Sequence, residues 1–157
     1  MTASELINDL NMSEQFFERS TRCLTEEQST FRPAEGIWTA AQQMAHVAQT
    51  IDWFIEGASR PEGFDLDFDK HTAAIQDVTS LAEARKWVAQ AYANARKFFE
   101  GKSDKELLRP LPEGPVMGGV PILGVVGAIM DHSAHHRGAL TIYSRMAGKT
   151  PIMPYAE

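Results

Sequence analysis

The chain has very little cysteine, with one residue, Cys23, among 157. No disulfide can form within the chain, and this condition is typical of proteins from a reducing compartment. On this basis we expect a cytoplasmic protein. Cys23 stands near the end of the first predicted helix, where we expect it to pack as a small apolar side chain.

Basic residues are few and scattered, since 15 lysines and arginines stand against 21 aspartates and glutamates, giving a net charge of −6. Nucleic-acid-binding proteins usually carry a stripe of positive charge, so we expect no nucleic-acid partner. Long hydrophobic runs are also lacking. The longest, from Val120 to Met130, is too short to span a bilayer, and no signal peptide follows Met1, so we expect no membrane partner.

The sequence lacks a convincing β-strand, an internal repeat and a low-complexity segment. Its apolar content of 43% and charged content of 23% are typical of a globular protein, and its length suffices for one hydrophobic core. We therefore expect residues 1–157 to form a single all-α domain.

Four segments show the periodicity of amphipathic helices, at about 2–24, 39–56, 80–100 and 121–147. The first three begin with capping-box spacing at Thr2, Thr39 and Ser80. Pro121 suits the first turn of the fourth helix, and Gly148 suits the position after its end. The residues predicted to face the core in the first and third helices are Leu6, Leu10, Phe17, Leu24, Leu81, Ala84, Val88, Ala91, Tyr92, Ala95 and Phe99.

The connections between these helices differ in character. Residues 58–79 contain Pro, Gly and Asp without a clear period, and they are long for a loop, so we expect a crossover between helices that are not antiparallel neighbours. Ser103 can start one extra helical turn. Residues 109–119, with three prolines and three glycines, are expected to be a loop, and 151–157 an extended tail.

Three of the five histidines lie within residues 131–138 of the fourth helix. His132 and His136 stand about 40° apart on one face, within the apolar stripe that includes Val125, Ile129 and Tyr143. Buried imidazoles need partners, and hydrogen bonds in the core would supply them. The i, i+4 spacing equally allows one helix to place two nitrogens on one metal ion.

The candidate for a third ligand is His46 in the second helix, which shares a side of that helix with Gln42, Gln49 and Trp53. The plainer core stripe of that helix points roughly the opposite way, so the helix is apolar on two sides; this stripe comprises Met44, Val47, Ala48, Ile51 and Ile55. One side would face the bundle interior and the other a second subunit or the long connection. Periodicity alone does not say which side carries His46 inward. An uncovered apolar face usually marks an interface, so we predict a C₂ homodimer.

Two motifs resemble those of the DinB/YfiT-like superfamily. Residues 36–46, GIWTAAQQMAH, resemble its "G-W-[ST]-x-x-x-[IL]-x-H" entry to the second helix. Residues 132–138, HSAHHRG, resemble its "H-x-x-x-H-R-G" signature in the last helix. Two positions depart from the pattern: Ala139 replaces a frequent Gln, which would alter the surroundings of the ligands, and Ile37 interrupts an aromatic run before Trp38.

The resemblance implies a four-helix bundle in up-down-down-up order, with a long crossover between the second and third helices. It also implies a divalent metal ion held by His46, His132 and His136 and, commonly, a homodimer. Three histidines on Zn²⁺, Ni²⁺ or Fe²⁺ leave a position open for water or substrate. A zincin protease site is disfavoured because Ser133 stands where that motif needs Glu.

Some members of this superfamily are S-transferases that use low-molecular-weight thiols such as bacillithiol or mycothiol. A metal-dependent enzyme of this thiol-transferase or detoxification type is therefore the first functional hypothesis. The alternative is a non-catalytic metal- or ligand-binding bundle with a role in stress-related sensing or in structure. A third hypothesis is a metal-free helical interaction module.

Five further residues carry side chains that can take part in binding or chemistry. His135 is expected at the surface or beside the ligands, and Asp131 is either an exposed acid or a partner that orients an imidazole. Arg137 is expected near the rim, paired with an acid or in contact with a substrate anion. His71, in the long connection, has no predicted partner, and Tyr143 is expected to pack beside the histidines.

Overall fold

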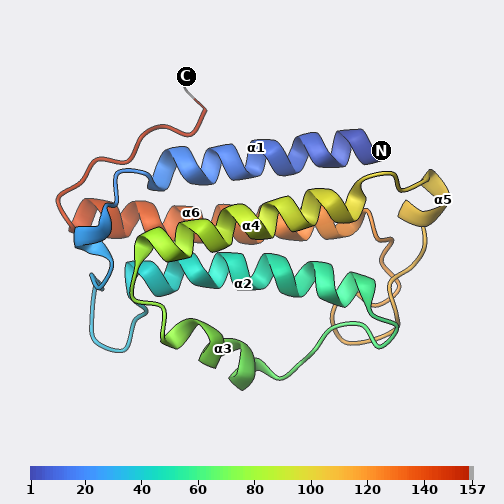
Figure 1. Cartoon of the computed structure of the whole chain (residues 1–157), viewed down its shortest axis with the longest axis horizontal. Helices are drawn as coiled ribbons and strands as arrows, with labels where there is room; N and C mark the ends of the chain where they lie inside the picture. The colour runs from blue at the N-terminus through green and yellow to red at the C-terminus, as the bar shows by residue number, and fades with distance from the viewer. Residues whose placement is uncertain (156–157) are drawn as a thin grey trace.

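The computed structural model describes residues 1–155, and residues 156–157 lie outside the description. The elements are α1 (Ala3–Thr21), a 3-10 turn η1 (Glu26–Gln28), α2 (Ala40–Ser59), α3 (Phe68–Gln76), α4 (Leu81–Phe99), α5 (Asp104–Leu107) and α6 (Gly124–Met146) (Figure 1). Within residues 1–155 no strand occurs beyond one isolated antiparallel bridge, which confirms the all-α class for this part of the chain. Over the same residues, no helix combines the length and apolar content needed to cross a membrane.

Side-chain caps fix where most of these helices begin. Thr39 accepts a hydrogen bond from the Gln42 amide at 3.2 Å, and the Gln42 side chain accepts one from the Thr39 amide at 3.0 Å, as the sequence predicts. Ser80 caps α4 in the same way, but Glu83 returns no bond, so this capping box is incomplete. The predicted extra turn at Ser103 is confirmed as α5, which has a complete box.

Three helix boundaries differ from the prediction. Pro121 is not in the first turn of α6, which begins three residues later, because Pro121 pairs with Pro110 in the isolated bridge. Hydrogen bonds on both sides of this bridge hold the 109–111 and 120–122 segments together. At the other two boundaries, α1 ends at Thr21, before the predicted end near Leu24, and α2 continues past the predicted stop before Gly57 and ends at Ser59.

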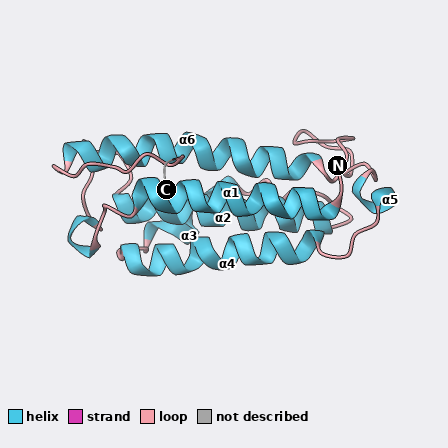
Figure 2. Ribbon diagram, turned by 90° about the horizontal axis from the view of Figure 1, so that it is seen from above, coloured by secondary structure: helices cyan, strands magenta, loops and turns pink. Residues whose placement is uncertain are grey.

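The four long helices lie side by side (Figures 1 and 2). α2 packs against α4 and α6, and α1 packs against the same two helices. Every residue predicted to face the core in the first and third helices is buried. The connection after α2 returns along the bundle, so that α4 begins near the end where α2 begins (Figure 1). The tail is irregular to Tyr155, and the rest of the predicted extended segment lies outside the described residues.

The second apolar side of α2 is covered by the chain itself. Trp53 packs against Phe64 and Phe68, with ring centroids 4.8 and 6.3 Å away, and its indole N–H donates to the Asp65 carbonyl at 2.7 Å. These residues belong to the connection that was predicted to be an irregular loop, which instead carries α3. The surface on which the homodimer prediction rested is therefore partly occupied, and the homodimer stays a prediction.

Gly57 should be intolerant of a side chain although it lies inside a helix. A Cβ at this position would lie 2.3 Å from Cδ1 of Phe64, so the Phe64 ring would have to move out of its place against Trp53. Gly57→Ala is expected to lower the free energy of unfolding by about 1–3 kcal/mol, despite the better helix propensity of alanine. Gly127→Ala is the matched control: it is exposed on α6 with nothing near its Cβ, and should stabilise slightly. Equal changes in the free energy of unfolding for Gly57→Ala and Gly127→Ala, measured by urea unfolding, would contradict the packing of Phe64 against Gly57.

Candidate metal centre

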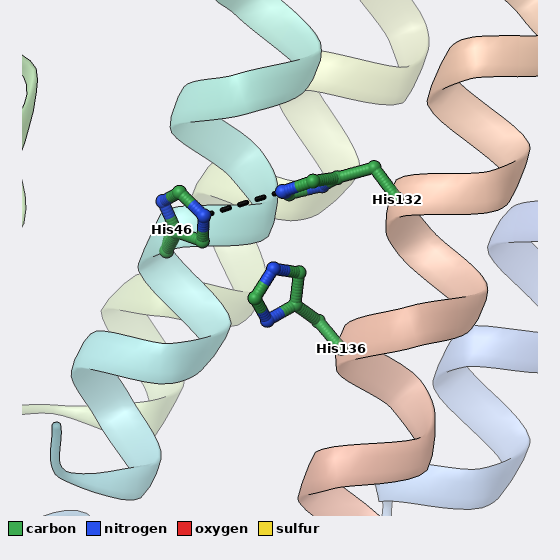
Figure 3. Close-up of side chains that lie close together, drawn as sticks. All are labelled: His46, His132 and His136. Atoms are coloured by element: carbon green, nitrogen blue, oxygen red, sulfur yellow. Dashed lines mark hydrogen bonds between the residues drawn. The ribbon is translucent and has the colours of Figure 1, made fainter. Parts of the chain in front are cut away.

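Two neighbouring helices bring three histidines together. His46 extends from α2, and His132 and His136 extend from α6 one turn apart, all toward the space between the two helices (Figure 3). This settles the orientation that periodicity left open: His46 faces inward. Both sides of α2 are covered. α3 and its flanking loop cover one side and the other bundle helices cover the opposite side, which explains why α2 has two apolar faces.

The ring nitrogens have a spacing that suits a metal ion. His46 Nε2 and His132 Nε2 are 3.2 Å apart, and one nitrogen from each of the three histidines lies within 4.8 Å of the others. Metal–nitrogen bonds of about 2.0–2.1 Å in a tetrahedral site separate two ligand nitrogens by about 3.3 Å. Among the described residues, this group contains histidines alone, so no carboxylate would neutralise a bound ion.

Burial keeps the three imidazoles neutral. Removal from water, with a smaller contribution from the neighbouring histidines, lowers the pKa of His46 to about 4, of His132 to about 3 and of His136 to about 4. A neutral imidazole has one ring nitrogen with a free lone pair, which is the form that binds metal ions. At neutral pH the cluster therefore presents three uncharged donors.

Gln43 orients the third histidine. Its buried side-chain amide lies 2.5 Å from His136 Nδ1, and the other ring nitrogen of His136 points toward the gap between His46 and His132 (Figure 3). The Gln43 atom that faces Nδ1 is the amide nitrogen Nε2. A half-turn of the amide group would place its oxygen there, where it would accept from Nδ1–H and leave Nε2 of His136 with its lone pair for a metal ion. The sequence analysis did not single out Gln43, although its place one turn before His46 was the available signal. It supplies a hydrogen-bond partner for the cluster.

His132 is in an environment that a purely structural histidine would not favour. Its Nδ1 is buried and has no hydrogen-bond partner within the described residues, while its Nε2 faces His46. An unpaired buried polar atom costs about 1–3 kcal/mol, and such atoms in native proteins often mark functional sites. The donor set and its spacing fit a metal ion on the Nε2 side of His132, whereas Nδ1 would be unpaired with or without that ion.

A cavity of about 190 Å³ opens beside His46 and His132. No lysine, arginine, aspartate or glutamate from residues 1–155 lines it. Its walls are aromatic and polar, and the other lining residues are Trp38, Gln49, Thr50, Trp53, Phe68, His71 and Thr72. A larger cavity, about 490 Å³, lies between α1 and α4 and does not touch the histidines. Small uncharged molecules are therefore the ligands that the histidine cavity suits.

The other residues singled out from the sequence lie around this centre. His135 is exposed, with its ring centroid 4.8 Å from that of His136, and Asp131 is exposed. Within the described residues Arg137 forms no ion pair and donates to the Tyr155 hydroxyl at 3.3 Å, so its pairing with an acid stays a prediction. Tyr143 donates to the Trp38 carbonyl at 2.9 Å and thereby ties α6 to the start of α2.

His71 is the residue whose position the sequence did not predict. It lies on α3, lines the same cavity as His46 and His132, and places its Nε2 3.0 Å from the Asp65 carbonyl. No sequence signal connected it to the other histidines, because the helix that carries it was not predicted.

Comparison with known proteins agrees with this architecture. The model of the DinB superfamily matches residues 10–140. A DinB-like protein from Bacillus cereus ATCC 10987 superposes with a TM-score of 0.74 at 18% identity, covering 97% of this chain and 95% of that one. YfiT from Bacillus subtilis, described as "a probable metal-dependent hydrolase with an unusual four-helix bundle topology", gives a TM-score of 0.73 at 15% identity, covering 94% and 89%.

A second Bacillus subtilis protein, the DinB-like YjoA, gives a TM-score of 0.62 at 17% identity, covering 96% of this chain and 94% of that one. At such identities the likeness concerns the fold. No functionally curated protein matches the sequence.

Proposed function

Because the chain belongs to the DinB superfamily, we propose that His46, His132 and His136 hold a divalent metal ion and that the protein is a metal-dependent enzyme. The observation that carries this proposal is the convergence of three neutral imidazoles from α2 and α6 beside a cavity. Imidazole ligands suit Zn²⁺, Ni²⁺ and Fe²⁺. Three protein ligands leave at least one coordination position for an exchangeable molecule, as in catalytic sites.

The nucleophile that we propose for this site is a low-molecular-weight thiol, so that the protein is an S-transferase of the detoxification type. A bound divalent ion would supply one chemical function, lowering the pKa of a thiol so that it binds as a thiolate. The chain contributes an aromatic wall formed by Trp38, Trp53 and Phe68, against which an apolar electrophile can pack. The cavity is smaller than the roughly 300–1,000 Å³ of drug-sized pockets, so it fits the sulfur-bearing end of a thiol and a small electrophile.

Hydrolysis is the second candidate, with water in place of the thiol. It is favoured by His71, a potential proton acceptor on the cavity wall, and by the description of the structurally similar YfiT as a probable metal-dependent hydrolase. A non-catalytic metal-binding role in sensing or structure is the remaining alternative. It requires that no small molecule enter the coordination sphere.

Cobalt substitution distinguishes these functions. We expect Co²⁺-loaded protein to develop an intense near-ultraviolet charge-transfer band when a small thiol such as 2-mercaptoethanol binds as a thiolate. Affinity should rise with pH until hydroxide competes, because binding releases the thiol proton. His132→Ala protein should show no band. Wild-type Co²⁺ protein whose spectrum is unchanged by several thiols would contradict the transferase function, and an unchanged spectrum with every small ligand tested would favour the non-catalytic role.

Three further features belong to the same proposal. The up-down-down-up order of α1, α2, α4 and α6 is supported by the return of the chain along α2 through α3 (Figure 1). The homodimer and the cytoplasmic location remain predictions from the family resemblance and from the single cysteine.

A further inference from the structure

His71 has a defined tautomer in this structure. Its Nε2 lies 3.0 Å from the Asp65 carbonyl oxygen, which can only accept a hydrogen bond, so Nε2 carries the proton. In a neutral imidazole the other nitrogen, Nδ1, then holds the lone pair. Within residues 1–155 the structure gives Nδ1 no hydrogen-bond partner, so it is free to accept a proton.

Asp65 is well suited to keep His71 in place. Its carboxylate accepts from Lys70 Nζ at 2.8 Å and from the Asp67 amide at 3.0 Å, and the bond from Lys70 holds the Asp65 pKa at about 2. The Asp65 carbonyl also accepts from the Trp53 indole at 2.7 Å. One backbone oxygen thus orients two residues that line the histidine cavity, His71 and Trp53.

The other residues lining the cavity offer no free base. Gln49, Thr50 and Thr72 do not titrate near neutral pH, and the aromatic residues have no basic nitrogen. His46 and His132 line the same cavity from α2 and α6, and their lone pairs are assigned to the metal ion. Asp65, Asp67 and Lys70, from the same segment as His71, are joined to one another by hydrogen bonds.

We infer that His71 is the proton acceptor for the nucleophile that enters this cavity, an inference that rests on the proposed function. As a thiol binds, its S–H bond breaks, the electron pair stays on sulfur, and the proton passes to Nδ1 of His71. The resulting imidazolium returns its proton to solvent or to the leaving group when the product departs. The same transfer would serve a water molecule in a hydrolase.

The tautomer can be measured without metal or substrate. In ¹⁵N-histidine NMR spectra of the metal-free full-length protein, with His71→Gln used to assign its signals, His71 should show a protonated Nε2 and an unprotonated Nδ1. A protonated Nδ1 would overturn the inference, because that nitrogen would then be a donor.

The kinetic test follows the thiolate band of Co²⁺-loaded protein after rapid mixing with 2-mercaptoethanol across a pH series. His71→Gln keeps a donor for the Asp65 carbonyl but cannot take up a proton. It should bind Co²⁺ as the wild type does and reach the same band at alkaline pH, yet form it about 100-fold more slowly at neutral pH. His135→Gln, the same change outside the cavity, should leave the rate and its pH profile unchanged.

The outcomes separate the inference from the function on which it rests. A wild-type band with an equal rate and pH profile in His71→Gln overturns the role of His71 and leaves the transferase proposal intact. Loss of Co²⁺ from His71→Gln also overturns it, since that result assigns His71 to the integrity of the site. Absence of the band in wild-type protein overturns the transferase proposal and this inference together.

Discussion

His132→Ala is expected to weaken divalent metal binding on the order of 10³-fold, the largest effect we predict for a single substitution. Structural zinc sites bind with about 10–16 kcal/mol in total, and loss of one of three ligands removes about a third of that energy. His132 Nε2 lies 3.2 Å from His46 Nε2, and its removal leaves His46 and His136 as the two remaining ligands of the site. Calorimetric titration of untagged protein with Zn²⁺ measures the change.

His135→Ala is the matched control for that experiment. It removes an exposed histidine from the same helix, one residue from His136, and should leave the affinity unchanged. Circular dichroism should show that both variants keep their helices, because the side chains that bury α6 in the core, such as Ile129 and Leu140, are unchanged. Loss of metal from the His135 variant with retention by His136→Ala would show that the ligand assignment is shifted by one residue.

Metal-free protein should lose stability steeply as the pH falls from about 6.5 toward 4. The pKa values of His46 and His136 are lowered to about 4 and that of His132 to about 3, whereas the unfolded chain takes up these protons near 6.5. Between these values the unfolded state binds more protons, so the stabilisation present above pH 6.5 is lost on acidification. The slope is about 1.4 kcal/mol per pH unit for each histidine protonated only in the unfolded state.

Urea unfolding at several pH values, with chelator present, measures this slope. Carboxylates titrate in the same range, so the informative quantity is the difference between wild type and a variant with all three histidines changed to Gln. The free energy of unfolding of the triple variant should change less with pH between 4 and 6.5 than that of the wild type. His132→Gln alone should show part of the same change and serves if the triple variant does not fold. Identical slopes for wild type and both variants would contradict the buried, neutral state of the cluster.

Local sequence signals predicted those helices that are stabilised by residues within the helix itself. Thr39 and Ser103 carry their capping partners within three residues, and Leu81 to Phe99 shows an apolar period that one core covers. α3 escaped prediction because it has a single buried residue, Ile75, and is held largely by contacts with Trp53 of another helix. The start of α6 was misplaced because the pairing of Pro121 with Pro110 is not a local signal.

The candidate site followed the same pattern. The i, i+4 spacing placed His132 and His136 on one face, and the resemblance to a family named His46 as their companion. Periodicity could not orient His46 because α2 is covered on both sides. Gln43 and His71 were missed since their roles depend on contacts across the bundle and on the unpredicted α3.

Anomalous diffraction at the zinc edge, from crystals of untagged protein grown with Zn²⁺, tests the central proposal most directly. We predict one peak per chain between α2 and α6, at bonding distance of about 2.0–2.1 Å from one ring nitrogen each of His46, His132 and His136. At least one further coordination position should hold a molecule that is not part of the chain. Absence of a peak between these histidines, or an ion whose coordination is completed by protein side chains alone, would contradict a catalytic metal centre at this site.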